Sequence, residues 1–140
     1  MTNPSDLQRA CLDAWNRRDF DTMKNLLHSD YTYTGPDGRE LKVPEAMKSH
    51  RMWATALPDG KVEIKWVVAQ GDVSVCEFVA SGTHNGELMG IAPTGKHVEI
   101  RVCKVMETRD NKIYRDRDYM DLLGLMIQIG AVQFPGNKAA

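Results

Sequence analysis

Four residues in the second half of the chain have side chains suited to acid/base chemistry: Asp121, His84, Arg117 and Tyr119. A carboxylate such as Asp121 can remove a proton next to a carbonyl when it is partly withdrawn from water. The enolate that forms needs hydrogen-bond donors in fixed positions, which an imidazole, a guanidinium or a phenol can supply. This set predicts proton transfer on a carbonyl compound. It does not distinguish cyclisation, double-bond isomerisation and dehydration.

The last predicted strand decides which of these side chains lie together. Alternate residues of a strand face the same side, so one face carries Ile113, Arg115, Arg117 and Tyr119. If Ile113 faces a pocket, Arg117 and Tyr119 line that pocket. Asp121, two residues further on, is then expected on the same side. Asp116 and Asp118 are then expected to point outward into solvent.

Asp121 and His84 each have a purely structural alternative. Asp121 stands directly before an apolar, helix-like run that ends at Gly130, and aspartate is a preferred N-cap. Capping is compatible with facing a cavity, so both roles stay open. An imidazole can polarise a carbonyl or exchange a proton near neutral pH, but His84 could equally be buried and bonded to loop backbone.

The glycine-rich stretch 81–96, which contains His84, resembles the rim of a pocket. It combines four glycines with polar residues and with apolar side chains, Met89 among them, that are expected to be buried. An ordinary ordered loop could have the same composition. Tyr33, His50 and Trp53 are further candidates for contact with a substrate, and for each of them a place in the core is the alternative.

The elements that must position these residues change their period along the chain. Helical spacing predicts helices that begin at Ser5 (with a capping box to Gln8), near Phe20 and at Pro44. Period-two alternation then predicts a strand over 29–34 and four more over 62–68, 73–84, 97–107 and 113–119. Helices first and an antiparallel meander after predict one α+β domain over 1–140, with helices packed on one face of a curved sheet.

Composition excludes several classes of function. The chain has 140 residues and a formal net charge of -1. This charge gives no positive electrostatic field that would attract nucleic acid or an anionic membrane. The chain has no apolar run of the ~20 residues that a membrane helix needs and no signal-peptide pattern at its start. Cys11, Cys76 and Cys103 lie in apolar patterns and are expected to be reduced thiols of a cytoplasmic protein. The four histidines are scattered, so no metal site is expected.

Sheet strands with apolar residues on both faces predict a homodimer. The segments 73–80 and 101–105 are the examples. An open sheet face of this kind on a small chain is best covered by a second copy.

From Leu57 to Gly130 an ordered set of short motifs resembles one known family. The set comprises Pro58-Asp59, Gly71-Asp72, Gly82-Thr83-His84, Gly86-Glu87-Leu88-Met89-Gly90, Pro93-Thr94-Gly95-Lys96, Asn111-Lys112-Ile113, Asp121 and Gln128-Ile129-Gly130. It is similar to the SnoaL-like polyketide cyclases (ester cyclases) of the nuclear transport factor 2-like superfamily.

The resemblance implies a cone-shaped fold in which a curved, mostly antiparallel sheet wraps around the N-terminal helices and leaves a deep pocket. It also implies catalysis without metal or organic cofactor. An aspartate at the position of Asp121 would act as the acid/base in an intramolecular aldol closure. One departure is Arg115-Asp116-Arg117, where the family often has Glu-x-Trp. A guanidinium in place of an aromatic wall favours a smaller or anionic ligand.

Two classes of function follow. The first is a cofactor-free enzyme that acts on a hydrophobic carbonyl compound by acid/base catalysis. The second is a non-catalytic module of the same fold that binds a small molecule or dimerises. Among enzymes, a dehydratase or hydrolase is a further alternative, which would need a second acid or an activated water beside the aspartate.

Overall fold

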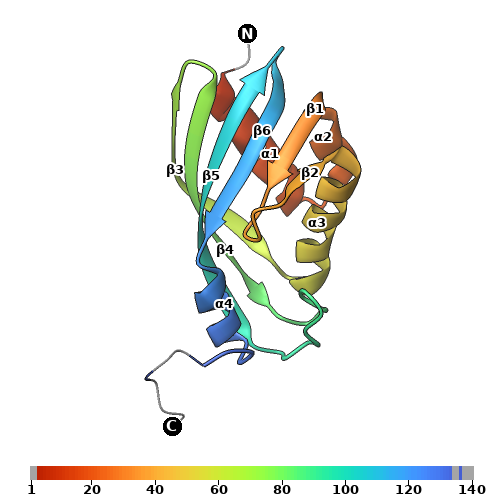
Figure 1. Ribbon diagram of the computed structural model, residues 1–140, viewed down its shortest axis with the longest axis vertical. Helices are drawn as coiled ribbons and strands as arrows, with labels where there is room; N and C mark the ends of the chain where they lie inside the picture. The colour runs from red at the N-terminus through yellow and green to blue at the C-terminus, as the bar shows by residue number, and fades with distance from the viewer. Residues whose placement is uncertain (1–2, 134–135, 137–140) are drawn as a thin grey trace.

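The computed structural model describes residues 3–133 and 136. Within them the chain forms four helices and six strands (Figure 1). In chain order these are α1 (Pro4–Asn16), α2 (Phe20–Asn25), β1 (Leu27–Thr34), β2 (Glu40–Lys42), α3 (Val43–Ala56), β3 (Lys61–Gln70), β4 (Val73–Thr83), β5 (His97–Arg109), β6 (Lys112–Met120) and α4 (Leu122–Gln128).

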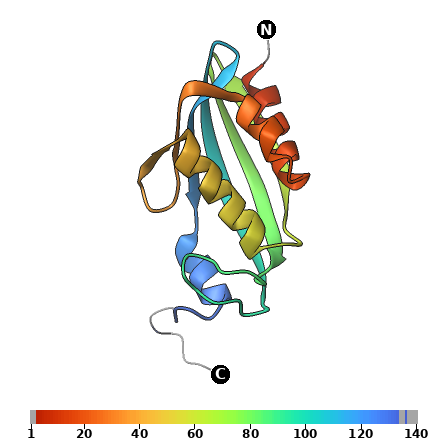
Figure 2. The ribbon, with the colours of Figure 1, turned by 90° about the vertical axis from the view of Figure 1, so that its right-hand side faces the viewer.

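All six strands belong to one curved sheet whose order is β2-β1-β6-β5-β4-β3. Neighbouring strands are antiparallel except β1 and β6, which run parallel. The sheet does not close, so β2 and β3 form its two edges. Helices α1 and α3 cover the same concave face, as the view turned by 90° shows (Figure 2). The predicted α+β fold is confirmed.

Helix α1 begins one residue earlier than its sequence predicts. Asn3 is the N-cap and its side chain accepts a hydrogen bond of 2.8 Å from the amide of Ser5. Gln8, expected to complete a capping box with Ser5, is instead fully buried. Its Nε2 donates to the carbonyls of Ser74 and Lys104 at 3.3 and 3.2 Å. An amide that satisfies two buried carbonyls ties α1 to the centre of the sheet.

Strand β6 contains a bulge that reverses the facing predicted for its second half. Glu107 of β5 pairs with Arg115, whereas the next residue, Thr108, pairs with Ile113. The extra residue, Tyr114, changes which side chains face inward. Asp116 is therefore buried, with 1% of its surface exposed, and the prediction that it points into solvent is wrong.

The same bulge places the neighbours of Asp116 opposite to expectation. Asp118 faces the helices, with its side chain 10% exposed, so its predicted outward position is also wrong. Arg117 and Tyr119 lie on the outer, convex face, where Tyr119 is 59% exposed. Among the described residues, no helix combines the length and the apolar character needed to cross a membrane.

Candidate active site

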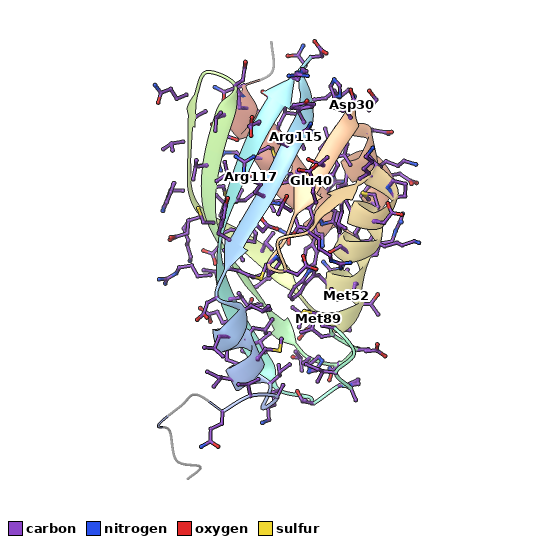
Figure 3. All side chains as sticks on the ribbon, in the orientation of Figure 1. Asp30, Glu40, Met52, Met89, Arg115 and Arg117 are labelled. Carbon is purple, nitrogen blue, oxygen red and sulfur yellow. The ribbon has the colours of Figure 1, made fainter. Side chains whose placement is uncertain are left out.

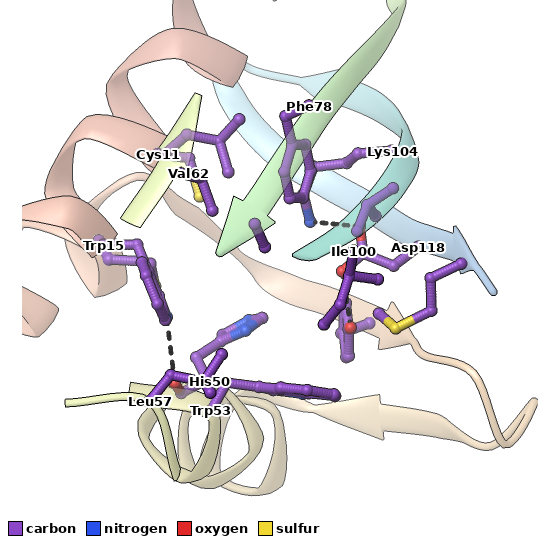
Figure 4. A pocket seen from close by; sticks show the side chains of 16 residues that line it. Cys11, Trp15, His50, Trp53, Leu57, Val62, Phe78, Ile100, Lys104 and Asp118 are labelled. Atoms are coloured by element: carbon purple, nitrogen blue, oxygen red, sulfur yellow. Dashed lines mark hydrogen bonds and ion pairs between the residues drawn. The ribbon is translucent and has the colours of Figure 1, made fainter. Parts of the chain in front are cut away.

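An apolar cavity of about 80 Å³ lies between the concave face of the sheet and helices α1 and α3 (Figure 4). Four aromatic side chains contribute to its walls: Trp15, Tyr33, Trp53 and Phe78. Three further polar side chains also border it: His50, Lys104 and Asp118. An apolar enclosure with a few convergent polar groups is the usual form of a small-molecule site.

The polar side of the cavity is built on a buried ion-pair cluster. Lys104 stands directly opposite Asp118 in the antiparallel register of β5 and β6. Its Nζ lies 3.0 Å from Asp118 Oδ1 and donates a hydrogen bond of 2.9 Å to Asp116 Oδ1. Only 4% of the lysine side chain is exposed. The cluster is therefore withdrawn from water, where charge interactions are strong.

Lys104 stays protonated in this position. Burial by itself lowers the pKa of its ammonium group, but Asp116 and Asp118 outweigh burial and raise that pKa well above its ordinary value. With both carboxylates ionised, the three side chains carry one negative charge in excess. A proton taken up by one carboxylate would neutralise the cluster.

Two tyrosines of β1 donate hydrogen bonds to the carboxylates. Tyr31 Oη donates to Asp116 Oδ2 at 2.9 Å, and Tyr33 Oη donates to Asp118 Oδ2 at 2.7 Å. Burial, followed by the neighbouring aspartate, raises the pKa of each phenol above its ordinary value. Both phenols are consequently neutral donors at pH 7.

His50 reaches the cavity from α3. Its ring packs edge-on against Tyr33, with centroids 4.8 Å apart, and its Nε2 lies 3.4 Å from Tyr31 Oη. Burial, reinforced by the charge of Lys104, lowers the pKa of His50 to about 4. The imidazole is therefore neutral at pH 7. Its backbone carbonyl accepts a 3.2 Å hydrogen bond from Trp15 Nε1, which links α3 to α1.

The sequence-based site residues divide into two groups. His50, Tyr33 and Trp53 line the cavity. Asp121 is exposed, and its Oδ1 accepts a 2.8 Å hydrogen bond from the amide of Gly124, so it is the N-cap of α4. It borders a separate depression beside Gln128 rather than the cavity. Its predicted role as the acid/base stays a prediction, and one that this placement does not favour.

His84 is fully buried in the loop after β4. Its Nδ1 lies 2.9 Å from Thr94 Oγ1 and accepts a 3.3 Å hydrogen bond from the amide of Thr94. These contacts hold the two ends of the loop together. The predicted catalytic role of His84 stays a prediction. His84 is not among the described residues that line the cavity.

The remaining predicted contacts lie outside the cavity. Arg117 donates to Glu107 Oε2 at 2.6 Å on the convex face, and Tyr119 is its exposed neighbour. Met89, 45% exposed, borders a groove on the helical side of the molecule. Figure 3 shows Arg117 on β6 and Met89 far from it, at the glycine-rich loop.

Sequence reasoning missed the cluster of Lys104, Asp116 and Asp118, although one signal was present. Alternate residues of β5 that face inward are apolar except Lys104: Val98, Ile100, Val102, Lys104 and Met106. A lysine at an inward position of a buried strand requires a buried partner of opposite charge. Among the described residues, no group of three or more His, Cys, Asp or Glu side chains is arranged to hold a metal ion.

The model of the SnoaL-like polyketide cyclase family matches residues 5–129. The chain belongs to this family. An aklanonic acid methyl ester cyclase, AcmA of Streptomyces galilaeus, is 26% identical over 125 residues, which are 87% of each chain.

Solved structures of this family share the fold. IdmH of Streptomyces antibioticus, described as a candidate polyketide cyclase, is 25% identical with a TM-score of 0.81, over 92% of this chain and 99% of IdmH. A candidate SnoaL-like cyclase from Jannaschia sp. CCS1 is 19% identical with a TM-score of 0.85, over 93% of each chain. At that identity the second likeness shows the fold alone. Together they show the SnoaL-like architecture.

Proposed function

We propose that the protein is a cofactor-free cyclase that closes a ring within a hydrophobic carbonyl substrate by acid/base catalysis, with Asp118 as the base. Membership of the SnoaL-like family supports a cyclase-type activity. The curated relative AcmA is an aklanonic acid methyl ester cyclase, which makes an ester of that kind the first substrate to test.

The observation that carries the proposal is the position of Asp118 at the wall of an apolar cavity. Tyr33 and Lys104 hold its two oxygens in place, and the cavity wall supplies the apolar surroundings in which a carboxylate works best as a base. A non-catalytic binding module would have no need of a buried cluster of ionisable side chains at the cavity wall, because burying such groups costs stability.

The proposed reaction conserves every atom of the substrate. Asp118 removes a proton from the carbon next to a carbonyl, and the electron pair moves to the carbonyl oxygen to give an enolate. The enolate carbon attacks a second carbonyl of the same molecule and forms the carbon–carbon bond. The alkoxide that results takes the proton back from Asp118. The product is an isomer of the substrate.

Tyr33 and Lys104 have a second role in this scheme. While Asp118 is ionised, Tyr33 donates a hydrogen bond to its Oδ2 and the Lys104 ammonium pairs with its Oδ1 at 3.0 Å. Once Asp118 has taken up a proton it is a weaker acceptor, and their N–H and O–H groups become available to the enolate oxygen. Donors that are already in place stabilise such an anion effectively in a site that excludes water. Neutral His50 adds no charge of its own.

The size of the cavity limits how much of a substrate it can receive. Its volume of about 80 Å³ is below the several hundred Å³, roughly 300 to 1,000, of a typical small-molecule pocket. The cavity therefore suits the reacting end of a ligand, and the remainder must lie elsewhere.

The test is to incubate the protein with aklanonic acid methyl ester and to analyse the mixture by chromatography with mass detection. We expect a new compound of unchanged mass whose amount grows with protein concentration. Heat-unfolded protein is the control. A substrate that binds but is recovered unchanged would favour the non-catalytic alternative, and a product that has lost water would favour a dehydratase.

A further inference from the structure

A second hollow, a groove of about 380 Å³, lies against the cavity on the helical side of the molecule. The loop between β1 and β2, helix α3, the glycine-rich loop and the start of α4 form its walls. Its lining is mainly apolar, with contributions from Pro36, Leu41, Met52, Met89 and Leu122. Met52 of α3 and Met89 of the glycine-rich loop both line this groove, and Figure 3 shows them near each other.

Tyr33 and Trp53 line both spaces. These two side chains therefore separate the small cavity, where Asp118 lies, from the larger groove. Figure 4 shows Trp53 projecting from α3 along the border of the cavity. The border between the smaller and the larger space coincides with one aromatic pair.

We propose that the groove holds the body of the substrate while its reacting carbonyl end enters the cavity, and that Trp53 with Tyr33 determines how bulky that end can be. This assignment rests on the proposed function. It accounts for a substrate that is larger than the cavity of about 80 Å³.

The charges around the groove indicate the class of ligand. Arg39 pairs with Asp37 at 2.7 Å, and Lys48 and Glu45 add one charge of each sign. The rim therefore has no net charge, and its apolar floor suits an uncharged, apolar body. Methionine side chains adapt well to such surfaces and make favourable contacts with aromatic rings.

Tyr33 connects the groove to the proposed base. Its ring is a wall of the groove, and its hydroxyl donates to Asp118. Gly35 lies close beneath this ring: a Cβ added there would lie 3.1 Å from the ring and 3.2 Å from Oη. Glycine at this position lets the β1–β2 loop pack against Tyr33 without displacing it.

The glycine-rich loop forms the far wall of the groove and is held to the end of α3. The amides of Asn85 and Gly86 both donate to the carbonyl of Ala56 at 3.1 Å. A Cβ on Gly86 would collide with the backbone of Thr55, so this approach requires glycine. Met89, at a positive φ of 49°, is thereby presented at the groove.

The groove can be tested by binding alone, with two ketones that share a methyl ketone head. Acetophenone is short, and 2-acetylanthracene extends into the groove. In Met89→Glu we expect the affinity for 2-acetylanthracene to fall by about tenfold or more, because its rings would cover an unpaired charge. The affinity for acetophenone should stay within about twofold. Met89→Leu, which keeps the groove apolar, is the matched control.

Equal effects on the two ketones, no effect on either, or no binding of 2-acetylanthracene by the wild type would overturn the groove assignment. Because these measurements need no turnover, they can succeed or fail independently of the proposed reaction.

The role of Trp53 is tested with a ketone whose head is bulky, 1-acetyladamantane. Trp53→Leu removes bulk from the border between the groove and the cavity. We therefore expect the affinity for 1-acetyladamantane to rise at least about threefold relative to the affinity for acetophenone. Trp53→Phe, which keeps an aromatic wall, should change this ratio much less. A melting curve confirms that each variant is folded. An unchanged ratio in Trp53→Leu would refute the assignment of Trp53.

Discussion

Replacing Lys104 with methionine should reveal how strongly the buried cluster depends on its one cation. Methionine has a similar length and an apolar end, so Lys104→Met removes the charge with little change in volume. Asp116 and Asp118, with side chains 1% and 10% exposed, would be left without a counter-ion. Removing one partner of a buried ion pair typically costs about 3 to 5 kcal/mol.

A loss of that size is a large part of the stability of an ordinary domain, which is about 5 to 15 kcal/mol. Urea unfolding followed by circular dichroism at pH 7 measures it directly.

A triple variant provides the matched control for this prediction. Lys104→Met combined with Asp116→Asn and Asp118→Asn removes all three charges. It should recover most of the lost stability, since the penalty arises from unbalanced charge and not from the missing methylene contacts. If Lys104→Met loses less than about 1 kcal/mol, or if the triple variant is no more stable than the single one, the electrostatic account of the cluster is wrong.

Three further predictions follow from the buried titratable groups and from the open sheet face. The folded-state pKa of His50 is lowered to about 4, so the unfolded state binds more protons than the folded state between pH 6.5 and 4. The free energy of unfolding should therefore fall by about 1.4 kcal/mol for each pH unit across this range. His50→Phe should flatten this slope in urea titrations. Burial raises the thiol pKa of Cys11 to about 12 and of Cys76 to about 11, so neither should react with iodoacetamide at pH 8 until the protein is unfolded; rapid native labelling of either would contradict this. We also propose a homodimer packed through the convex sheet face, where Val68 is 58% exposed; Val68→Glu should shift sedimentation toward the monomer, whereas a monomeric wild type at micromolar concentration would exclude the dimer.

The order and type of the main elements could be read from the sequence because each depends on local pattern. Helical spacing and capping located α1 and α3, and period-two alternation located β3, β4 and β5. The short strand β2 was missed because its three residues carry no period.

The candidate site could not be predicted in the same way, because it depends on a one-residue bulge in β6 and on pairing between strands that are distant in the sequence. The bulge at Tyr114 leaves the alternating pattern of the sequence intact while it exchanges the two faces of β6. Predicting inward positions for Arg117 and Tyr119 was therefore reasonable locally and wrong in the structure.

Long-range strand pairing brings the two tyrosines to the cluster. The parallel pairing of β1 with β6 places Tyr33 beside Asp116 in the register, although the two are far apart in the chain. No short-range pattern encodes that pairing. The inward lysine of β5 was the local sign that a buried carboxylate had to exist elsewhere in the sequence.

The most direct test of the central claim is the rate at which the protein exchanges substrate protons next to the carbonyl for solvent deuterium. The protein is incubated with aklanonic acid methyl ester in D₂O, and deuterium incorporation into the substrate is followed by mass spectrometry. This measures proton removal separately from ring closure. Asp118→Asn keeps a polar side chain of the same shape but cannot act as a carboxylate base, so exchange should fall by about 10²-fold or more.

Asp121→Asn is the decisive comparison, because asparagine caps a helix about as well as aspartate and Asp121 lies outside the cavity. We expect it to exchange at nearly the wild-type rate, with melting curves showing that both variants are folded. Near-normal exchange in Asp118→Asn, together with loss of exchange in Asp121→Asn, would contradict the account and return the catalytic role to the aspartate at the start of α4.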